Sequence, residues 1–465
     1  MASHTSKALL WALFFLVYGF SLAQEKKCES SRYGSKPRVF VLTDMSNEPD
    51  DQMSLVRFLT YANEFDIQGI AAITSTWLPS RTDPDTIREV VQDGYGQVVD
   101  NLSANAPADA SYPSTEEILS KISSAHPVYG LEVLKANNLS DAAANLVKAT
   151  DDSDHVSNTR DEAAIESFVS KLRVYSISDQ DDAGSWIRAR YPALFYIVSL
   201  HGWSEYTQPT WIGISGEEYR HFDVGGPNSA IVSNEWLQQH IRIGPLGAHY
   251  LNWSFIMEGD TPAFLPLVQN GLGDIGHPEW GSWGGRYVQV DAPTAAHHSV
   301  YSDTADYVEG ADGKAYSSRF ATIWRWREAY QYDYAARMQW TINGNFDENN
   351  HQPVVVVDGS CGPAVTEVPY KFGDQIVFDA SESWDPDNDE LHYEWFHYRE
   401  AGARGLEGFS IPLVSNNLNI TSLNSDGSIV AVEPQRNQTM HLILSVTDNN
   451  DMPLVTYRRL ILKPN

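Results

Sequence analysis

Four acidic side chains crowd the segment that follows the first apolar run of the mature chain, in the stretch RVFVLTDMSNEPDDQMSLVRFL. They are Asp44, Glu48, Asp50 and Asp51. Carboxylates this close repel one another, and a bound cation is a common compensation. Ca²⁺ prefers carboxylate and carbonyl oxygens, so this acidic segment is a candidate calcium site. A second interpretation stays open, because Pro49 suits a helix start and acidic residues in a first turn suit the helix dipole.

Two later segments carry side chains that suit sugar binding. Glu258 stands two residues before Asp260 and could touch a sugar hydroxyl, or be an ordinary polar loop residue. Trp280 and Trp283 lie among glycines in HPEWGSWGGRY, and indole faces can stack on sugar rings. The alternative for both tryptophans is packing inside a rigid loop.

The elements that would position these residues alternate between strand and helix from residue 37 to about residue 345. Short apolar runs predict buried strands at 38–43, 67–76, 173–178 and 193–199. Their flanks predict helices at 51–65, 85–102 and 183–192. This pattern predicts an α/β domain with a mostly parallel sheet and helices on both faces. Ligands bind beyond the carboxyl ends of such strands, which is where the acidic segment falls.

The pattern changes after residue 345. A polar stretch at 346–352 predicts a linker, and short β-rich runs separated by Asn, Asp, Gly and Pro follow it. These runs predict an all-β, immunoglobulin-like sandwich over residues 353–465. Within it, FDASESWDPDNDELHYEWFHY resembles the immunoglobulin-like repeat of the polycystic-kidney-disease type. Its three alternate aspartates either hold a cation or lie in a solvated turn: Asp385, Asp387 and Asp389.

The net charge excludes some classes of partner. The chain has 465 residues and a formal net charge of −29. Such a charge repels phosphate backbones and anionic lipid, so we expect no nucleic acid and no membrane as partner. It does not repel a neutral sugar, nucleoside or polysaccharide. We therefore expect a carbohydrate or nucleoside-like small molecule, or a cell-wall polysaccharide, as the ligand.

The N-terminus predicts that the protein is secreted and extracellular. An apolar run at 9–20 and small residues before a cleavage point after Ala23 predict a signal peptide at 1–23 and a tail at 24–36. Five sequons fit a secreted glycoprotein: Asn101, Asn138, Asn252, Asn419 and Asn437. In an oxidising compartment Cys28 and Cys361 could pair and tie this tail to the region between the two domains.

The α/β part resembles the nucleoside hydrolases, whose opening loop reads D-T-D-P-G-x-D-D. The matching residues here are Thr43-Asp44 and Asp50-Asp51. The resemblance is closer to a secreted subfamily with a C-terminal β-sandwich, the cellulose-binding proteins. The stretches that carry it are KLRVYSISDQDDAGSWIRARYPALFYIVS, TWIGISGEEY, GPNSAIVSNEWLQQHIR, GPLGAHY, MEGDTPAFLPLVQNGLGD and HPEWGSWGGRY.

This resemblance implies roles for particular residues. Asp44 matches a metal-bound aspartate that also acts as general base, and Asp51 and Asp260 match further metal ligands. Asp50 matches an aspartate that grips sugar hydroxyls. The resemblance also implies that Asn234 in SNEW binds sugar and that a backbone carbonyl near Asn138 completes the metal site.

Three departures from the family pattern bear on function. Leu42 replaces the first aspartate, and the loop between Asp44 and Asp50 is two residues longer. Gly259 replaces a histidine that sits near the leaving group in nucleoside hydrolases. The short, polar sequence at 130–138 predicts that an apolar central strand is absent.

Two functions follow from these residues and the resemblance. The first is a secreted hydrolase of a glycosidic or N-glycosidic bond, in which Asp44 removes a proton from a Ca²⁺-bound water. The alternative is a non-catalytic protein that binds cellulose or a related polysaccharide, favoured by Gly259 and the absent strand. A relative with a damaged site and no activity is a third interpretation.

Overall fold

The computed structural model describes residues 28, 32, 34–124, 162–179, 183–199, 208–215, 228–254, 256–290, 299–310, 313–402 and 417–465. The predicted signal peptide, Asn138 and the stretch 130–138 lie outside these residues. The strands of the α/β part are β1 (Arg38–Thr43), β2 (Asp66–Ala72), β3 (Ile122–Ser124), β4 (Arg173–Ser178), β5 (Phe195–Ser199), β6 (Tyr287–Gln289), β7 (Val300–Asp303), β8 (Asp306–Glu309) and β9 (Ala315–Ser318). The helices are α1 (Pro49–Thr60), α2 (Pro84–Glu89), α3 (Val99–Asn105), α4 (Thr115–Leu119), α7 (Glu162–Lys171), α8 (Ala183–Arg190), α9 (Asn234–His240), α10 (Gly244–Gly247), α11 (Ala321–Trp324) and α12 (Arg327–Ile342).

The predicted parallel strands and helices of the α/β domain are confirmed. The apolar runs at 38–43 and 173–178 form β1 and β4, and the other two runs form the shorter β2 and β5. β1 pairs in parallel with β2, and β2 with β3. β4 pairs in parallel with β5, and β5 with β7, while β6 is antiparallel to β7.

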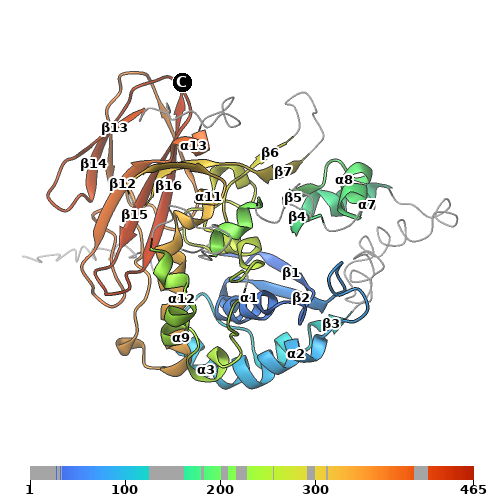
Figure 1. Ribbon diagram of the computed structural model, residues 1–465. Helices are drawn as coiled ribbons and strands as arrows, with labels where there is room; N and C mark the ends of the chain where they lie inside the picture. The colour runs from blue at the N-terminus through green and yellow to red at the C-terminus, as the bar shows by residue number, and fades with distance from the viewer. Residues whose placement is uncertain are drawn as a thin grey trace, which may run out of the picture.

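These strands form two separate sheets in the part of the chain that the structure describes, and β8 and β9 form a third sheet of two antiparallel strands. The orders are β1-β2-β3 and β4-β5-β7-β6, so β1 and β4 are edge strands. Figure 1 shows β4 and β5, with α7 and α8 (green), apart from β1 and β2 (blue). Leu42 on β1 is 48 % exposed, which is unusual for an apolar residue on a parallel strand. The sequence predicted largely parallel pairing, which the structure confirms, and among the described residues this pairing is divided between two sheets.

Helix α12 is the main buried helix of the α/β domain. It packs against α1, α3, α9 and α10, and most of its side chains are buried. Its Arg337 is buried with Glu64 and Asp333, which satisfy its guanidinium. Its aromatic and aliphatic residues join the core that α1 and β2 line. This core fixes α1, whose first turn carries part of the acidic segment.

The C-terminal part is the predicted β-sandwich. One sheet has the order β10-β16-β15-β12 and the other β11-β14-β13. All their pairs are antiparallel except β10 with β16. The bounds are β10 (Thr366–Tyr370), β11 (Ile376–Asp379), β12 (His392–His397), α13 (Arg399–Gly402), β13 (Leu418–Ser422), β14 (Ile429–Pro434), β15 (Met440–Thr447) and β16 (Val455–Pro464).

The sandwich packs directly on the α/β part. Tyr457 of β16 belongs to the same core as α1 and α12, and its backbone N–H donates to the carbonyl of Asn270 at 2.8 Å. Arg459, fully buried, donates to the carbonyl oxygens of Leu272 and Trp280. The boundaries predicted at 345 and 353 stay a prediction. The sandwich has an apolar core of its own, and a few of its residues, Tyr457 among them, join the core of the α/β part.

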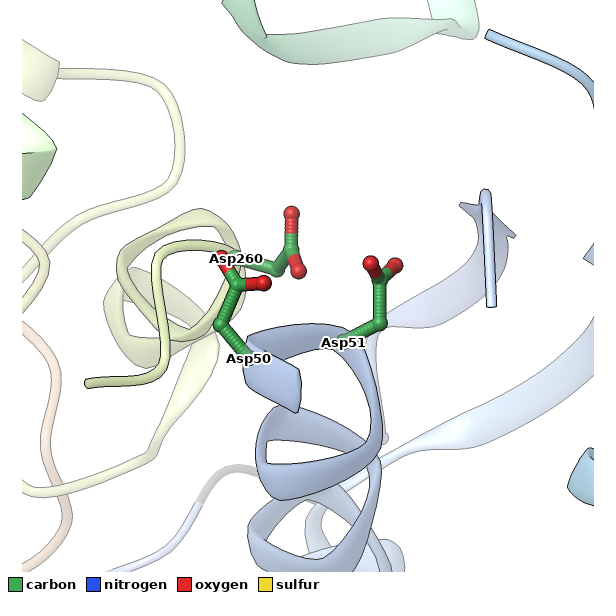
Figure 2. Close-up of side chains that lie close together, drawn as sticks. All are labelled: Asp50, Asp51 and Asp260. Atoms are coloured by element: carbon green, nitrogen blue, oxygen red, sulfur yellow. The ribbon is translucent and has the colours of Figure 1, made fainter. Parts of the chain in front are cut away.

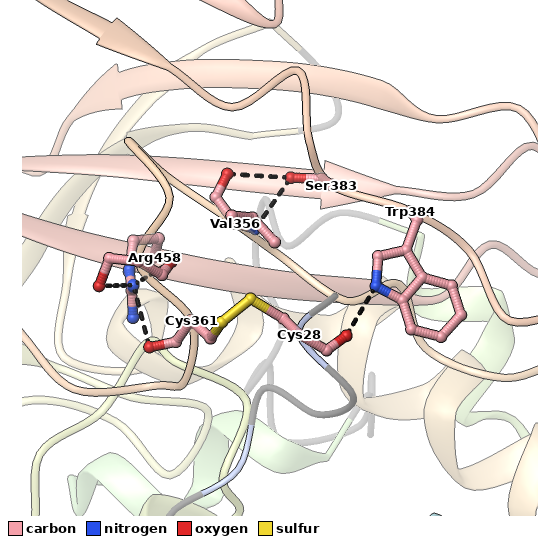
Figure 3. The surroundings of a disulfide bond; sticks show 7 residues. Cys28, Val356, Cys361, Ser383, Trp384 and Arg458 are labelled. Atoms are coloured by element: carbon pink, nitrogen blue, oxygen red, sulfur yellow. Dashed lines mark hydrogen bonds between the residues drawn. A yellow bond between two sulfur atoms is a disulfide. The ribbon is translucent and has the colours of Figure 1, made fainter. Parts of the chain in front are cut away.

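A disulfide joins Cys28 to Cys361, as the sequence allowed. Figure 3 shows the bond, with the indole N–H of Trp384 donating to the carbonyl of Cys28 at 2.9 Å. The tail is therefore attached to the start of the sandwich both covalently and by this hydrogen bond.

Candidate functional site

Three carboxylates meet at the N-terminal end of α1. Asp50 and Asp51 lie in its first turn, after Pro49, and Asp260 lies just before the short helix η8 (Thr261–Ala263). One oxygen from each carboxylate lies within 4.8 Å of the others. Figure 2 shows the three side chains pointing to the same side of the helix end. We call these residues the acidic triad. Asp50 and Asp51 therefore lie at a helix start, as one interpretation of the acidic segment expects, and they also converge on a third carboxylate, which leaves the calcium site a prediction.

Without a counter-ion, the three carboxyl groups of the acidic triad are difficult to ionise together. Burial, followed by the charges of Glu48 and Asp44, raises the pKa of Asp50 to about 7. The pKa of Asp51 is raised well above its usual value by burial, then by Asp260 and Asp44. Burial also raises the pKa of Asp260 well above its usual value, followed by the charges of Asp50 and Asp44. Bringing a cation among them would favour the ionised form of all three.

The oxygen atoms of the acidic triad suit a hard cation. Oδ2 of Asp260 is buried and has no hydrogen-bond partner among the described residues. Asp51, 6 % exposed, accepts a hydrogen bond from the hydroxyl of Thr43 at the end of β1. An orphaned buried carboxylate oxygen is costly, and Ca²⁺ bound by carboxylate oxygens would remove that cost. The residues present therefore fit the ion that the family resemblance implies.

Asp44 stands beside the acidic triad but is not part of it. Its charge acts on all three carboxylates, and its backbone carbonyl accepts from the N–H of Asn47 at 3.1 Å. The sequence assigned metal binding to Asp44, Asp51 and Asp260, and sugar binding to Asp50. The structure instead brings Asp50 together with Asp51 and Asp260. The carboxylate of Asp44 therefore lies next to the position that an ion bound by the triad would take.

The glycine at residue 259 leaves room for the side chain of Asp50. A Cβ atom on Gly259 would lie 2.7 Å from Oδ2 of Asp50 and 3.2 Å from the indole of Trp211. Any larger side chain, including the histidine of the family pattern, would need the space that Asp50 and Trp211 occupy. The position of Asp50 in the triad therefore depends on the absence of a side chain at residue 259.

Glu258 lies inside the protein and not at a surface where a ligand could reach it. It is fully buried, and its Oε2 lies 2.6 Å from Nε of Arg57. Tyr250 and Thr261 also donate to its carboxylate. The prediction that Glu258 touches a sugar is wrong, because no part of it reaches solvent. It instead holds the loop before Asp260 against α1, with its own backbone at a φ of 53°.

Asn234 and the two tryptophans also have structural contacts. The side chain of Asn234 donates to the carbonyl of Trp253 at 3.0 Å and accepts from Arg242 at 2.7 Å, which leaves the predicted sugar contact without support. Trp283 is 1 % exposed and packs near Tyr457, so its predicted stacking on a sugar is wrong. The part-exposed Trp280 has one ring face covered by His277, at 3.8 Å between ring centroids.

Sequence reasoning missed two residues that position the acidic triad. Thr43 holds Asp51, and Arg57 holds the loop of Asp260 through Glu258. Thr43 ends an apolar strand and directly precedes Asp44, and this position could have indicated its role from the sequence. Nothing in the sequence indicates the role of Arg57, which has the pattern of a surface residue of an amphipathic helix but is 0 % exposed.

The split parallel sheets, the acidic triad at a strand end and the appended sandwich define a nucleoside-hydrolase-like protein with a C-terminal β domain. The chain belongs to the family of cellulose-binding Sde182 proteins. The nucleoside hydrolase-like domain of that family matches residues 38–157 and 154–287, and its C-terminal domain matches residues 375–464. This confirms the resemblance found in the sequence.

The structure is similar to that of a nucleoside hydrolase-related hypothetical protein from Saccharophagus degradans that is associated with carbohydrate metabolism. The TM-score is 0.72 and the sequence identity 29 %, over 93 % of this chain and 100 % of that one. The comparison with curated proteins gives no match. Among the described residues, no helix has the length and apolarity needed to cross a membrane.

Proposed function

We propose that this protein is a secreted carbohydrate-binding protein whose acidic triad holds Ca²⁺ at the ligand site. The observation that carries the proposal is the convergence of Asp50, Asp51 and Asp260, with a buried oxygen of Asp260 that has no hydrogen-bond partner among the described residues. The family name supports a polysaccharide such as cellulose as the ligand. The net charge of −29 favours a neutral sugar over a polyanion.

The residues of the site have separate tasks in this proposal. Asp50, Asp51 and Asp260 hold the ion, Thr43 orients Asp51, and the pair of Arg57 and Glu258 positions the loop of Asp260. A Ca²⁺ ion held there supplies positive charge and lowers the pKa of a coordinated water. Extracellular placement agrees with the Cys28–Cys361 disulfide, because such bonds persist in oxidising compartments.

Hydrolysis of a glycosidic or N-glycosidic bond is the second candidate function. Asp44 favours it, because this carboxylate lies beside the triad and could accept a proton from an attacking water. Carboxylates near the sugar would also favour the positive charge that develops at the anomeric carbon. Two features favour binding alone. Gly259 removes the group expected near a leaving base, and β1, which leads into the site, is an edge strand in the described part of the chain.

Calorimetric titration of Ca²⁺ into the metal-stripped full-length protein tests the proposal first. We expect the wild type to bind Ca²⁺ at the triad and Asp260→Asn to lose that binding. Cello-oligosaccharide binding should then require Ca²⁺ and should be lost in Asp260→Asn. Oligosaccharide binding that survives both chelation and this substitution would overturn the proposal.

Turnover separates the two candidate functions. Nucleosides and oligosaccharides are offered to the Ca²⁺-loaded wild type and to Asp44→Asn. Turnover that Asp44→Asn abolishes, with Ca²⁺ affinity retained, would establish the hydrolase. Ligand binding without turnover in the wild type would establish the binding protein.

A further inference from the structure

A second group of carboxylates lies in the sandwich, on the loop between β11 and β12. Asp385, Asp387 and Asp389 occupy alternate positions, and one oxygen of each lies within 4.8 Å of the others. Carboxylates at alternate positions of one loop are a common arrangement for binding Ca²⁺. Such clusters also occur in solvated turns, so the spacing alone does not establish a site.

The surroundings of Asp385 differ from those of a solvated turn. Its side chain is 6 % exposed, and its Oδ1 accepts from the backbone N–H groups of Asp387 at 2.7 Å and Asp389 at 3.2 Å. Its Oδ2 is buried and has no hydrogen-bond partner in the described part of the chain. A buried acceptor without a donor is costly, and a cation would satisfy it.

In the part of the chain that the structure describes, no lysine or arginine forms an ion pair with this group. Among the described residues, the ion-pair contact of these carboxylates is with His351, whose Nδ1 lies 2.9 Å from Oδ1 of Asp387. The backbone N–H of His351 donates to the other oxygen of Asp387 at 2.7 Å. Asp389 accepts only from a neutral amide, that of Asn450, at 2.8 Å. The negative charge of the loop is therefore left largely unbalanced by the protein.

We propose that Asp385, Asp387 and Asp389 form a Ca²⁺ site that fixes the linker between the two domains onto the sandwich. This site is separate from the acidic triad and does not depend on the function proposed for the triad. Its effect on the linker follows from His351, which Asp387 holds by two contacts. The ring of His351 stacks on Phe346 and on Trp340 near the end of α12. An ion that orders Asp387 thus orders the segment that leaves α12.

The neighbouring residue Trp384 gives the site a second connection. It directly precedes Asp385, and its indole N–H donates to the carbonyl of Cys28. Figure 3 shows this indole next to the disulfide. The loop therefore lies where the linker, the N-terminal tail and the sandwich meet. An indole this near to a bound lanthanide also sensitises its luminescence, which provides a local probe.

The test uses the full-length protein with the triad disabled by Asp260→Asn. Calorimetry should show Ca²⁺ binding in Asp260→Asn that weakens about tenfold or more when Asp385→Asn or Asp389→Asn is added. Two variants are used because Asp389 is less buried, and its replacement is the safer one for folding. Asp451→Asn, an exposed acid on a nearby loop, is the matched control and should leave the affinity unchanged.

Terbium luminescence locates the site independently. Tb³⁺ emission excited through tryptophan should be weaker in Asp260→Asn/Trp384→Phe than in Asp260→Asn. In both variants Ca²⁺ should still compete with Tb³⁺ for the site. Equal Ca²⁺ affinity in Asp260→Asn and in Asp260→Asn/Asp389→Asn would overturn the proposal, as would no binding by folded Asp260→Asn. If wild type and Asp260→Asn bind alike and Asp389→Asn abolishes that binding, the triad proposal fails and the sandwich site stands.

Discussion

Oδ2 of Asp50 lies 2.7 Å from the point where a Cβ atom on Gly259 would stand. The two residues are 209 positions apart in the chain, yet the absence of a side chain at one lets the other join the acidic triad. The family pattern implies a sugar-facing role for Asp50, whereas here its carboxylate lies with those of Asp51 and Asp260. The glycine also leaves no imidazole at the position where the family pattern has a histidine.

Gly259→Ala should weaken Ca²⁺ binding at the triad while the protein stays folded. The new methyl group meets the end of the Asp50 side chain, which can rotate away, and the backbone of Gly259 has no positive φ. We expect a loss of about tenfold in affinity, measured by calorimetry. Gly34→Ala is the control, because no atom lies within 4 Å of its Cβ position. Unchanged affinity in Gly259→Ala would mean that Asp50 is not a ligand.

Asp260→Asn should stabilise the metal-free protein and remove the stabilisation that Ca²⁺ gives through the triad. In chelator, the substitution removes a buried carboxyl group whose ionised form is unfavourable beside Asp50 and Asp51, a gain on the order of 1 kcal/mol. The amide can also donate a hydrogen bond to a neighbouring carboxylate. Thermal unfolding with chelator and with Ca²⁺ measures both effects, with exposed Asp93→Asn as control. A lower unfolding temperature of Asp260→Asn in chelator would contradict the repulsion argument.

Arg57→Met should destabilise the protein strongly, by about 3–5 kcal/mol, because it leaves the fully buried Glu258 without its cation. The double substitution Arg57→Met/Glu258→Gln removes both charges and should recover part of that loss. Urea unfolding of the two variants measures the difference. If the single variant were no less stable than the double one, the ion pair would not be what secures this loop.

His441 should make the protein sensitive to acid. Burial lowers its pKa well below the usual value, and the charge of Arg459, whose guanidinium donates to Nδ1 at 2.9 Å, lowers it further. The folded state therefore binds fewer protons than the unfolded one, so the contribution to stability is present above about pH 6.5 and declines as the pH falls below it.

The pH dependence of thermal unfolding tests this assignment. His441→Asn keeps an acceptor for Arg459 and should flatten the dependence below about pH 6.5. His392→Asn, at an exposed histidine on β12, should leave the curve as in the wild type. A curve for His441→Asn that still follows the wild type would assign the acid sensitivity to other groups.

The strand predictions succeeded where local sequence carries the information. Apolar runs identified β1 and β4 to the residue, and the acidic segment together with Asp260 contained every member of the triad. Local spacing could not decide which of Asp44 and Asp50 joins Asp51, because that depends on the space at Gly259. This space is a property of the tertiary packing.

The failed predictions concern side chains whose type suits two environments. For Trp283 and Glu258 the sequence allows a ligand contact or a structural role, and both are buried against residues distant in the chain, Tyr457 and Arg57. The sequence around Glu258 does not indicate that its partner is Arg57, which lies 201 positions away in the chain. A buried charge is found from the sequence only when its counter-charge is known.

The bond between Cys28 and Cys361 spans 333 positions of the chain. It therefore closes almost the whole α/β domain and the linker into a single covalent ring. A protease that cuts this ring once, at any exposed loop, leaves the two pieces attached to each other. Only a second cut, or reduction of the bond, can release the sandwich from the domain that carries the acidic triad.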